Sequence, residues 1–331
     1  MNMADEDFRR KMVKGIADGI DRYFEDHPSK HQMSPGSSSG NGSSSETIIT
    51  DPEQDSSLEE FLAELDEGQD TGAPGTVQAA AAAVRKKYTD AAQEKGEIWA
   101  VTILDLFDGS QADIRGDEKV ISASVIKAFI MGTVYEQVLD PQSGASDTKG
   151  SDPEKWKSLI EKMITVSDND ASNTMVEMLG DGDFSKGAKI VNEFCKEHGY
   201  TKTSLGRRFL GSNKDGDNYT SSNDCASLLR DLYNEALISK ESSREMLAYL
   251  KGQTRTNKIP AGISGKEAET ANKTGELAGD TGFCENDIAI VWGKETDYVL
   301  CILASDLKSG NEKAVYNIRD ISGIVYEEIA Q

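Results

Sequence analysis

Three short motifs follow one another along the chain, and together they carry the residue types of an acyl-transfer site. They are Ser124-Val125-Ile126-Lys127, Ser167-Asp168-Asn169 and Lys273-Thr274-Gly275. A serine hydroxyl is a weak nucleophile until a base takes its proton, and a lysine one helical turn further on lies on the same helix face. A second serine with an asparagine can relay a proton and hold a substrate amide. The set therefore predicts covalent catalysis at Ser124.

Ser124 is distinguished from two other serines that precede a lysine at the same spacing. The pairs Ser146–Lys149 and Ser305–Lys308 lie in a turn-rich stretch and at the end of a β-like run. Only Ser124 opens an apolar segment, residues 125–131, that can form a buried helix. The N-terminal end of a helix suits a nucleophile because its free N–H groups and its dipole stabilise developing negative charge. Ser124 is therefore the predicted nucleophile.

Composition restricts the function further. The net charge of −22 argues against nucleic acid and anionic membranes as partners. Four cysteines in no zinc spacing and three histidines predict no metal and no cofactor. His27 and His31 lie near the N-terminus and His198 stands alone, so no Ser-His-Asp triad is apparent and lysine is favoured as the base. No apolar run is long enough for a transmembrane segment.

The chain divides into three regions by composition. Residues 1–27 predict an amphipathic helical tail, with apolar side chains every four residues: Phe8, Met12, Ile16, Ile20 and Phe24. Residues 28–75 are rich in Gly, Ser and acidic residues and predict a flexible, disordered linker. Residues 76–331 carry the apolar periodicity of a folded domain.

Strand patterns stand at both ends of this domain, around a helical middle. An alanine-rich helix is expected to about residue 93, strands at 99–106 and 111–115, helices over 122–250, strands at 269–273, 287–292 and 298–305, and a closing helix over 312–329. The predicted class is α+β. An antiparallel sheet is flanked by the N- and C-terminal helices, with an all-helical lobe beside it.

The motif set resembles that of class A β-lactamase-like serine hydrolases, in the superfamily of β-lactamases and penicillin-binding proteins. The likeness covers about residues 76–331. It includes Asn218-Tyr219-Thr220-Ser221 before a helix, and Asn286-Asp287-Ile288-Ala289-Ile290-Val291 as the strand after the third motif.

The resemblance implies a role for each residue of the motifs. Ser124 is the nucleophile, Lys127 is its general base and Ser167 relays protons to the leaving nitrogen. The substrate is bound by Asn169, Lys273, Thr274 and Gly275, and the backbone N–H groups of Ser124 and Glu276 form the oxyanion hole. Asp168 has a structural role.

One element of the family pattern is missing. Class A enzymes carry a loop glutamate that activates the water for deacylation. In this chain Phe209 falls at that position and Asn213 on the family's loop asparagine, and no glutamate occurs from 198 to 234. The sequence therefore predicts an acyl-enzyme that is hydrolysed slowly.

Three functions remain open. The first is a serine hydrolase that forms an acyl-enzyme with β-lactams or related amides. The second is a D-Ala-D-Ala peptidase or transpeptidase acting on cell-wall peptides, and the third is a penicillin-binding sensor module without turnover. Each takes a small-molecule β-lactam or a cell-wall peptide as partner, and a monomer is expected. These ligands place the protein outside the cytoplasmic membrane, with the cytoplasm as the alternative because no export signal is visible.

Two further groups of residues carry weaker expectations. Arg207 and Arg208 are either substrate-facing cations or, as is more common, ion-paired. Cys195 and Cys301 lie among apolar residues and are expected in the core, whereas Cys225 and Cys284 have polar neighbours and are candidates for a disulfide.

Overall fold

The computed structural model describes residues 73–90, 92, 95–140, 152–214, 216–279, 282–308 and 311–330. The predicted tail, the predicted linker up to residue 72 and the pair Ser146–Lys149 lie outside these residues.

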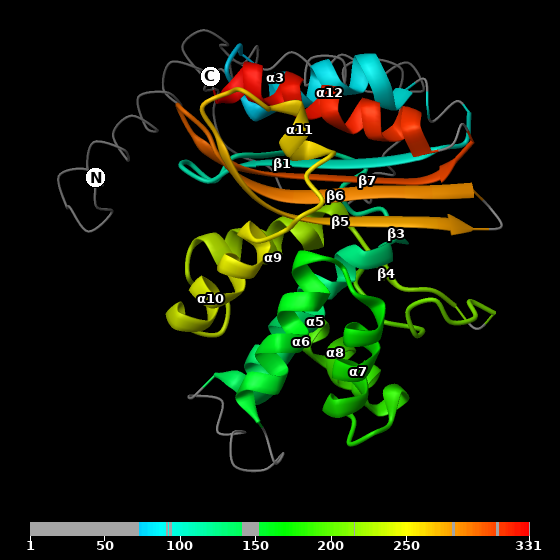
Figure 1. Ribbon diagram of the computed structural model, residues 1–331. Coiled ribbons are helices and arrows are strands. Elements are labelled where there is room, and N and C mark those ends of the chain that lie inside the picture. The colour runs from blue at the N-terminus through cyan, green and yellow to red at the C-terminus, as the bar shows by residue number, and fades with distance from the viewer. Residues whose placement is uncertain are drawn as a thin grey trace, which may run out of the picture. The chain divides into compact units, whose positions relative to one another are not determined.

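A five-stranded antiparallel sheet forms the centre of the described domain (Figure 1). Its strands, in the spatial order β2-β1-β7-β6-β5, are β1 Ile98–Asp105, β2 Gln111–Ile114, β5 Glu269–Gly279, β6 Gly282–Trp292 and β7 Asp297–Leu307. β5 and β6 extend beyond the predicted apolar runs, because buried polar residues such as Asn286 belong to the strand and find hydrogen bonds there. β5, which carries the third motif, is an edge strand.

Both faces of the sheet are buried, and alternate residues of each strand serve different cores. In β7, Val299, Cys301 and Leu303 belong to the core shared with the helical lobe. Leu300 and Ile302 belong to the core on the opposite face. This two-residue period is that of a strand covered on both sides, and it explains the continuous apolar run in the sequence.

Helices from the two ends of the domain cover one face (Figure 1). They are α3 Val77–Val84, which continues as the wider turn η1 Arg85–Thr89, and α12 Asn311–Ile329. The short α11 Ile259–Gly262, which precedes β5, packs against α12. α3 begins after Thr76, whose hydroxyl accepts the backbone N–H of Ala79 at 3.2 Å. α12 packs along α3, so the predicted pairing of terminal helices on one sheet face is confirmed.

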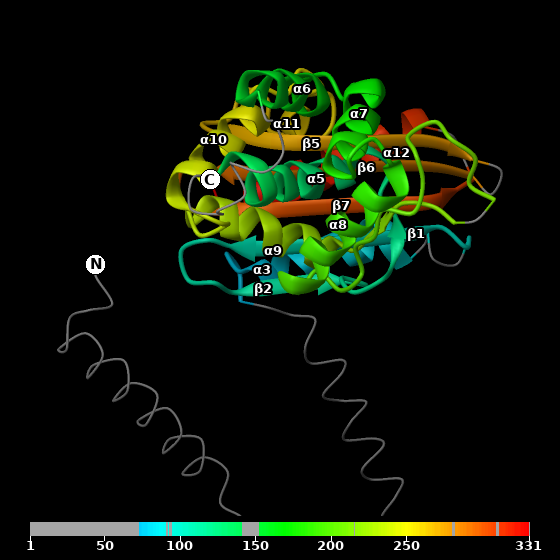
Figure 2. The ribbon, with the colours of Figure 1, turned by 90° about the horizontal axis from the view of Figure 1, so that it is seen from below.

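The opposite face carries the helical lobe, which Figure 2 shows in front of the sheet. Its helices are α5 Lys127–Val134 with η3 Tyr135–Leu139, α6 Pro153–Thr165, α7 Asn169–Leu179, α8 Phe184–Glu197, α9 Ser222–Tyr233 and α10 Lys240–Lys251. α6 to α10 each follow an Asp or Ser whose side chain accepts a backbone N–H of the first turn. A small ribbon, β3 Val120–Ile121 with β4 Tyr219–Thr220, leads into the short 3₁₀ turn η2 Ala123–Ile126. The α+β prediction is confirmed. Within the described ranges no helix combines the length and the apolar character needed to cross a bilayer.

All four cysteines are free thiols in the interior, so the predicted disulfide between Cys225 and Cys284 is wrong. Their polar sequence neighbours are misleading because Cys225 lies on the sheet-facing side of α9. The Cys284 sulfur faces the carbonyl oxygen of Ile121 at 3.4 Å. Burial raises the pKa of Cys195 and of Cys284 to about 12, so both thiols stay protonated.

Candidate active site

Ser124 lies in η2, immediately before α5, rather than in the first turn of a regular α-helix. The preceding residue, Ala123, has a φ of 45°, a strained conformation for a residue with a side chain. Gly275 of β5 packs against this turn. A Cβ on Gly275 would lie 2.9 Å from the Ser122 carbonyl oxygen and 3.0 Å from the Ser124 nitrogen. Only glycine therefore lets β5, and with it Glu276, lie against the backbone of Ser124.

The Lys127 side chain is fully buried among oxygen acceptors. Its ammonium donates to the Ser167 carbonyl oxygen at 2.7 Å, to Asn169 Oδ1 at 2.7 Å and to Ser167 Oγ at 3.3 Å. Burial lowers the pKa of Lys127 to about 7. A substantial fraction of Lys127 is therefore an unprotonated amine at neutral pH, which a general base requires.

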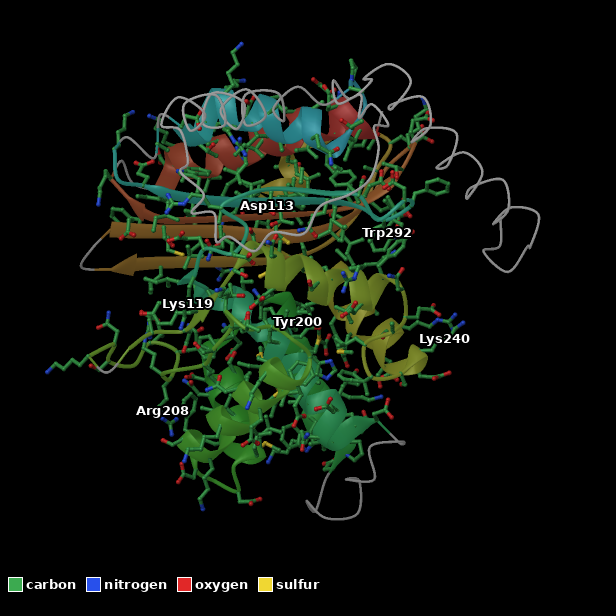
Figure 3. All side chains as sticks on the ribbon, turned by 180° about the vertical axis from the view of Figure 1, so that it is seen from behind. Asp113, Lys119, Tyr200, Arg208, Lys240 and Trp292 are labelled. Atoms are coloured by element: carbon green, nitrogen blue, oxygen red, sulfur yellow. The ribbon has the colours of Figure 1, made fainter. Side chains whose placement is uncertain are left out.

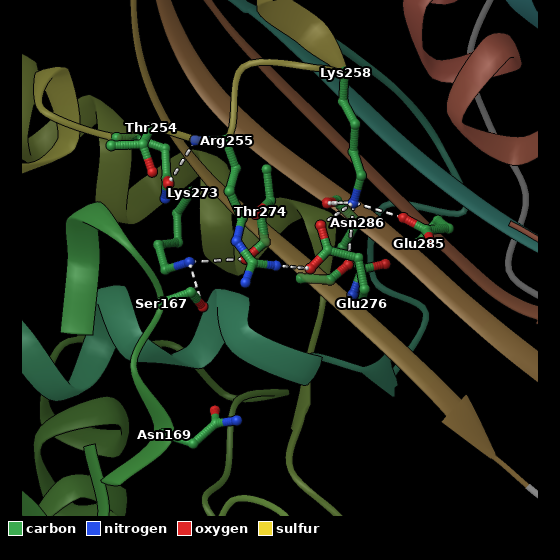
Figure 4. A network of polar contacts seen from close by, with 12 residues as sticks. Ser167, Asn169, Thr254, Arg255, Lys258, Lys273, Thr274, Glu276, Glu285 and Asn286 are labelled. Atoms are coloured by element: carbon green, nitrogen blue, oxygen red, sulfur yellow. Dashed lines mark hydrogen bonds and ion pairs between the residues drawn. The ribbon is translucent and has the colours of Figure 1, made fainter. Parts of the chain in front are cut away.

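Ser167 lies between two buried lysines. Its hydroxyl oxygen accepts hydrogen bonds from Lys273 Nζ at 3.0 Å and from Lys127 Nζ at 3.3 Å. Figure 4 shows the contact between Ser167 and Lys273. Burial and the nearby charge of Lys127 lower the pKa of Lys273. Ser167 holds this place with a φ of 62°, a second strained residue at the site. A hydroxyl between two amines is placed to pass a proton.

The second motif also fixes the start of α7. Asp168 Oδ1 accepts the backbone N–H of Ala171 at 2.7 Å and caps the helix, in agreement with the structural role expected for it. Asn169 is the first residue of that helix, with its side chain on Lys127. The Thr274 hydroxyl is buried and has no hydrogen-bond partner among the described residues. The Thr274 hydroxyl therefore has no competing hydrogen bond among these residues.

These residues meet at a cleft of about 60 Å³. Its lining residues are Ala123, Ser124, Asn169, Arg207, Phe209, Leu210, Asp217, Asn218, Glu276 and Leu277. The structure thus brings Ser124, Asn169 and Glu276 to one cleft. From Asn169, a chain of hydrogen bonds runs through Lys127 and Ser167 to Lys273. In the described ranges no cluster of His, Cys, Asp and Glu is arranged to hold a metal ion.

The loop between α8 and β4 carries Phe209 to the cleft. The Phe209 backbone N–H donates to Asn173 Oδ1 at 2.9 Å, and Asn173 Nδ2 donates to the Phe209 carbonyl oxygen at 3.2 Å. The centroid of the Phe209 ring lies 4.6 Å from Lys127 Nζ. An aromatic ring therefore stands beside the candidate base, where the resemblance expects a glutamate.

The expectation for Asn213 is wrong, because Asn213 is exposed and the loop asparagine at the cleft is Asn218. Asn218 Oδ1 accepts the backbone N–H groups of Gly206 and Arg207 at 2.9 and 3.0 Å, so it stabilises the loop. The stretch between these two asparagines includes a turn at Lys214 that a linear register cannot reproduce.

Both loop arginines are ion-paired, as the more common alternative holds. Arg207 Nε lies 2.8 Å from Asp217 Oδ1, and Arg208 pairs with Glu177 of α7. Figure 3 shows Arg208 at the outer edge of the helical lobe. Arg207 contributes to the cleft wall through a cation that is already neutralised.

Sequence reasoning missed Asn173 and the charged residues Arg255, Lys258 and Glu285 around Glu276. Asn173 could have been found, because it lies four residues after Asn169 on the same face of α7. The charged network joins partners 18 to 27 residues apart, and no local pattern marks them.

Comparison with known proteins agrees with this geometry. The sequence model of the β-lactamase enzyme family matches residues 82–329, three quarters of the chain. The chain belongs to this family. It is 29% identical over 242 residues to β-lactamase OXY-1 of Klebsiella oxytoca, covering 66% of this chain and 80% of that protein. It is also 29% identical over 185 residues to a β-lactamase of Phocaeicola vulgatus, covering 53% and 56%.

Solved class A β-lactamases share the fold of this β-lactamase family member. A variant of the last common ancestor of Gram-negative class A β-lactamases superimposes with a TM-score of 0.62 at 22% identity, covering 74% of this chain and 97% of that one. The β-lactamase of Sphaerobacter thermophilus gives a TM-score of 0.62 at 22% identity, covering 75% and 95%. Family and fold together identify a serine hydrolase of the class A β-lactamase type.

Proposed function

We propose that this hydrolase forms a covalent acyl-enzyme at Ser124 with β-lactams or related amides and releases the acyl group slowly. Neutral Lys127 takes the proton of the Ser124 hydroxyl as the serine oxygen bonds to the substrate carbonyl carbon. The backbone N–H groups of Ser124 and Glu276 hold the oxyanion. Ser167, in contact with Lys127, delivers a proton to the nitrogen as the C–N bond breaks. Asn169, Lys273, Thr274 and Gly275 bind the substrate.

The placement of Phe209 over Lys127 carries the slow-release half of this proposal. Hydrolysis of the ester needs a base that activates water, and a phenyl ring accepts no proton. Asp217, a loop carboxylate at the same cleft, is occupied by Arg207 through contacts of 2.8 and 3.2 Å. Loss of a positioned general base typically slows a step by about 10² to 10⁴.

The same arrangement favours a second candidate, a D-Ala-D-Ala peptidase or transpeptidase that acts on cell-wall peptides. An acyl-enzyme shielded from water persists long enough to meet an amine acceptor, whose proton Lys127 can take. If the acyl-enzyme is not released at all, the protein would act as a sensor module without turnover. The fate of the adduct separates these candidates.

We further propose that the protein works as a monomer outside the cytoplasmic membrane, where β-lactams and cell-wall peptides occur. The alternative is the cytoplasm. Fractionation of the native host with an antibody, and light scattering of the full chain, test the two parts of this proposal.

Intact-protein mass spectrometry after addition of benzylpenicillin tests the chemistry. One equivalent of adduct should form and decay over minutes to hours. Ser124→Ala should abolish the adduct, whereas Ser305→Ala, which removes the serine of the other described S-x-x-K pair, should not. Turnover at tens per second would contradict slow release, and transfer of the acyl group to an added D-amino acid would select the transpeptidase.

A further inference from the structure

Glu276 lines two spaces of very different size. One is the catalytic cleft of about 60 Å³, and the other is a cavity of about 760 Å³. The larger cavity is bounded by charged residues that include Arg255, Lys258 and Arg319. The Glu276 side chain is 27% exposed, so its carboxylate is accessible to a ligand.

The Glu276 carboxylate is already engaged by two cations (Figure 4). Its Oε2 lies 2.9 Å from Arg255 Nη1, and its Oε1 lies 2.9 Å from Lys258 Nζ. Burial alone would raise the pKa of Glu276, but the charge and hydrogen bond of Lys258 and the charge of Arg255 lower it overall. Glu276 is therefore ionised at neutral pH. It forms an ion pair with the Arg255 guanidinium, which solvent can reach because the Arg255 side chain is 48% exposed.

The cations near Glu276 are balanced by acids. Lys258 is fully buried, and its Nζ also lies 2.6 Å from Glu285 Oε2. Glu285 is the residue of β6 directly opposite Glu276 of β5. Two carboxylates in facing positions repel each other unless a cation bridges them. Lys258 is thus committed to this pair and adds no free positive charge to the cleft.

Thr274 and Glu276 share one face of β5 because they are two residues apart on a strand. Thr274 binds the substrate under the proposed function, and its hydroxyl has no hydrogen-bond partner among the described residues. A carboxylate arriving there finds an anion close by, and finds Arg255 already occupied. Without the charge of Glu276, Arg255 and Lys258 would face a single acid, Glu285.

We propose that Glu276 is a specificity-determining residue that makes this site select acyl donors with no carboxylate beside the leaving nitrogen. Resting on the proposed function, this inference narrows the substrate class to amides, β-lactams or esters that are uncharged at the position bound by Thr274. Glu276 acts through its charge. Its carboxylate is paired with Arg255 at the position that a substrate carboxylate would otherwise take.

Acylation by two matched ligands tests the inference. Benzylpenicillin carries the carboxylate, and its methyl ester does not. The second-order acylation constants of both are measured by mass spectrometry for the unaltered chain and for Glu276→Gln, which keeps the shape and backbone but removes the charge. The acid-to-ester ratio should rise at least about tenfold in Glu276→Gln. The greater bulk of the ester cancels, because each variant is tested with both ligands.

Glu269→Gln is the matched control, because Glu269 is also on β5 and pairs with Lys251 at 3.3 Å, away from the cleft. This control should keep the ratio of the unaltered chain within about twofold. The inference is overturned if Glu276→Gln changes the ratio no more than the control does. Absence of any adduct with either ligand in all three proteins would instead overturn the proposed function, and the inference with it.

Discussion

The two walls of the catalytic cleft are built in opposite ways. One wall, formed by η2, the start of α7 and β5, holds buried amines and hydroxyls in hydrogen-bond contact, with Ser167 between Lys127 and Lys273. The other wall, the loop from Ser204 to Tyr219, presents the Phe209 ring and an acid already paired with arginine. Under the proposed function, proton transfer during acylation has amines and hydroxyls available on the first wall, whereas the second wall offers no free base for hydrolysis of the ester.

Removing the base from the first wall should have the largest effect. Lys127→Ala is expected to lower the rate of benzylpenicillin acylation by about 10² to 10⁴. The reason is that Lys127 is the proposed base for Ser124, whereas Lys273, the other amine in contact with Ser167, comes from β5. Labelling by a fluorescent penicillin measures the rate. Lys162→Ala, an exposed lysine of α6, is the control and should react like the unaltered chain. A variant at position 127 that keeps a tenth of the rate would show that another group is the base.

Adding a base to the second wall should have a smaller effect. Phe209→Glu is expected to speed decay of the acyl-enzyme by about 10- to 100-fold. This is less than the effect of a positioned general base, because the loop does not hold a hydrolytic water next to the new carboxylate. The new carboxylate also faces Lys127 and should raise its pKa, so acylation at pH 7 should slow. Decay of the adduct is followed by mass spectrometry after removal of free ligand.

Leu210→Glu provides the control for this change. Leu210 is the next residue, lines the same cleft and is 81% exposed. A glutamate there adds the same charge without facing Lys127 in place of the ring. Equal acceleration by both variants would mean that charge at the cleft mouth, rather than a base at position 209, limits hydrolysis.

The first wall was largely readable from the sequence, because its residues are tied to short motifs whose spacing fixes their helix and strand positions. Lys127, Ser167 and Lys273 lie in hydrogen-bond contact, and Ser124 lines the same cleft as Asn169. The second wall was only partly readable. Phe209 reaches Lys127, but Asn213 does not reach the cleft, because turns between residues 209 and 219 decide which side chains point inward.

The charged network beyond Glu276 was not predictable. Lys258 would ordinarily be assigned to the surface, yet it is fully buried because β5 and β6 bring Glu276 and Glu285 face to face. Cys225 and Cys284 were misjudged for the converse reason, since polar neighbours in sequence do not prevent burial of one face of a helix or strand.

The pH dependence of acylation should reflect the first wall. Because the active form of Lys127 is the unprotonated amine, and burial lowers its pKa to about 7, the rate should rise with pH and level off above about 7. Below that value the rate should fall about tenfold per pH unit, as the ammonium form comes to dominate. Labelling rates between pH 5 and 9 measure the midpoint. A midpoint near 10 would mean that Lys127 is not desolvated in solution.

The smallest expected effect links the two walls. The Phe209 ring lies 4.6 Å from the Lys127 ammonium, and such a contact favours the charged form by about 0.5 to 2 kcal/mol. Phe209→Leu keeps an apolar side chain but removes the π face, so the pKa of Lys127 should fall by roughly 0.4 to 1.5 units. The midpoint of the acylation profile should move to lower pH by that amount.

Phe184→Leu removes a comparable ring, 4.7 Å from the Arg208 guanidinium in the same lobe, and should leave the midpoint in place. A shift to higher pH in Phe209→Leu would show that the ring acts mainly by excluding water from Lys127, because admitting water restores the charged amine. The direction of the shift therefore decides whether the aromatic ring tunes the base by its charge distribution or by desolvation.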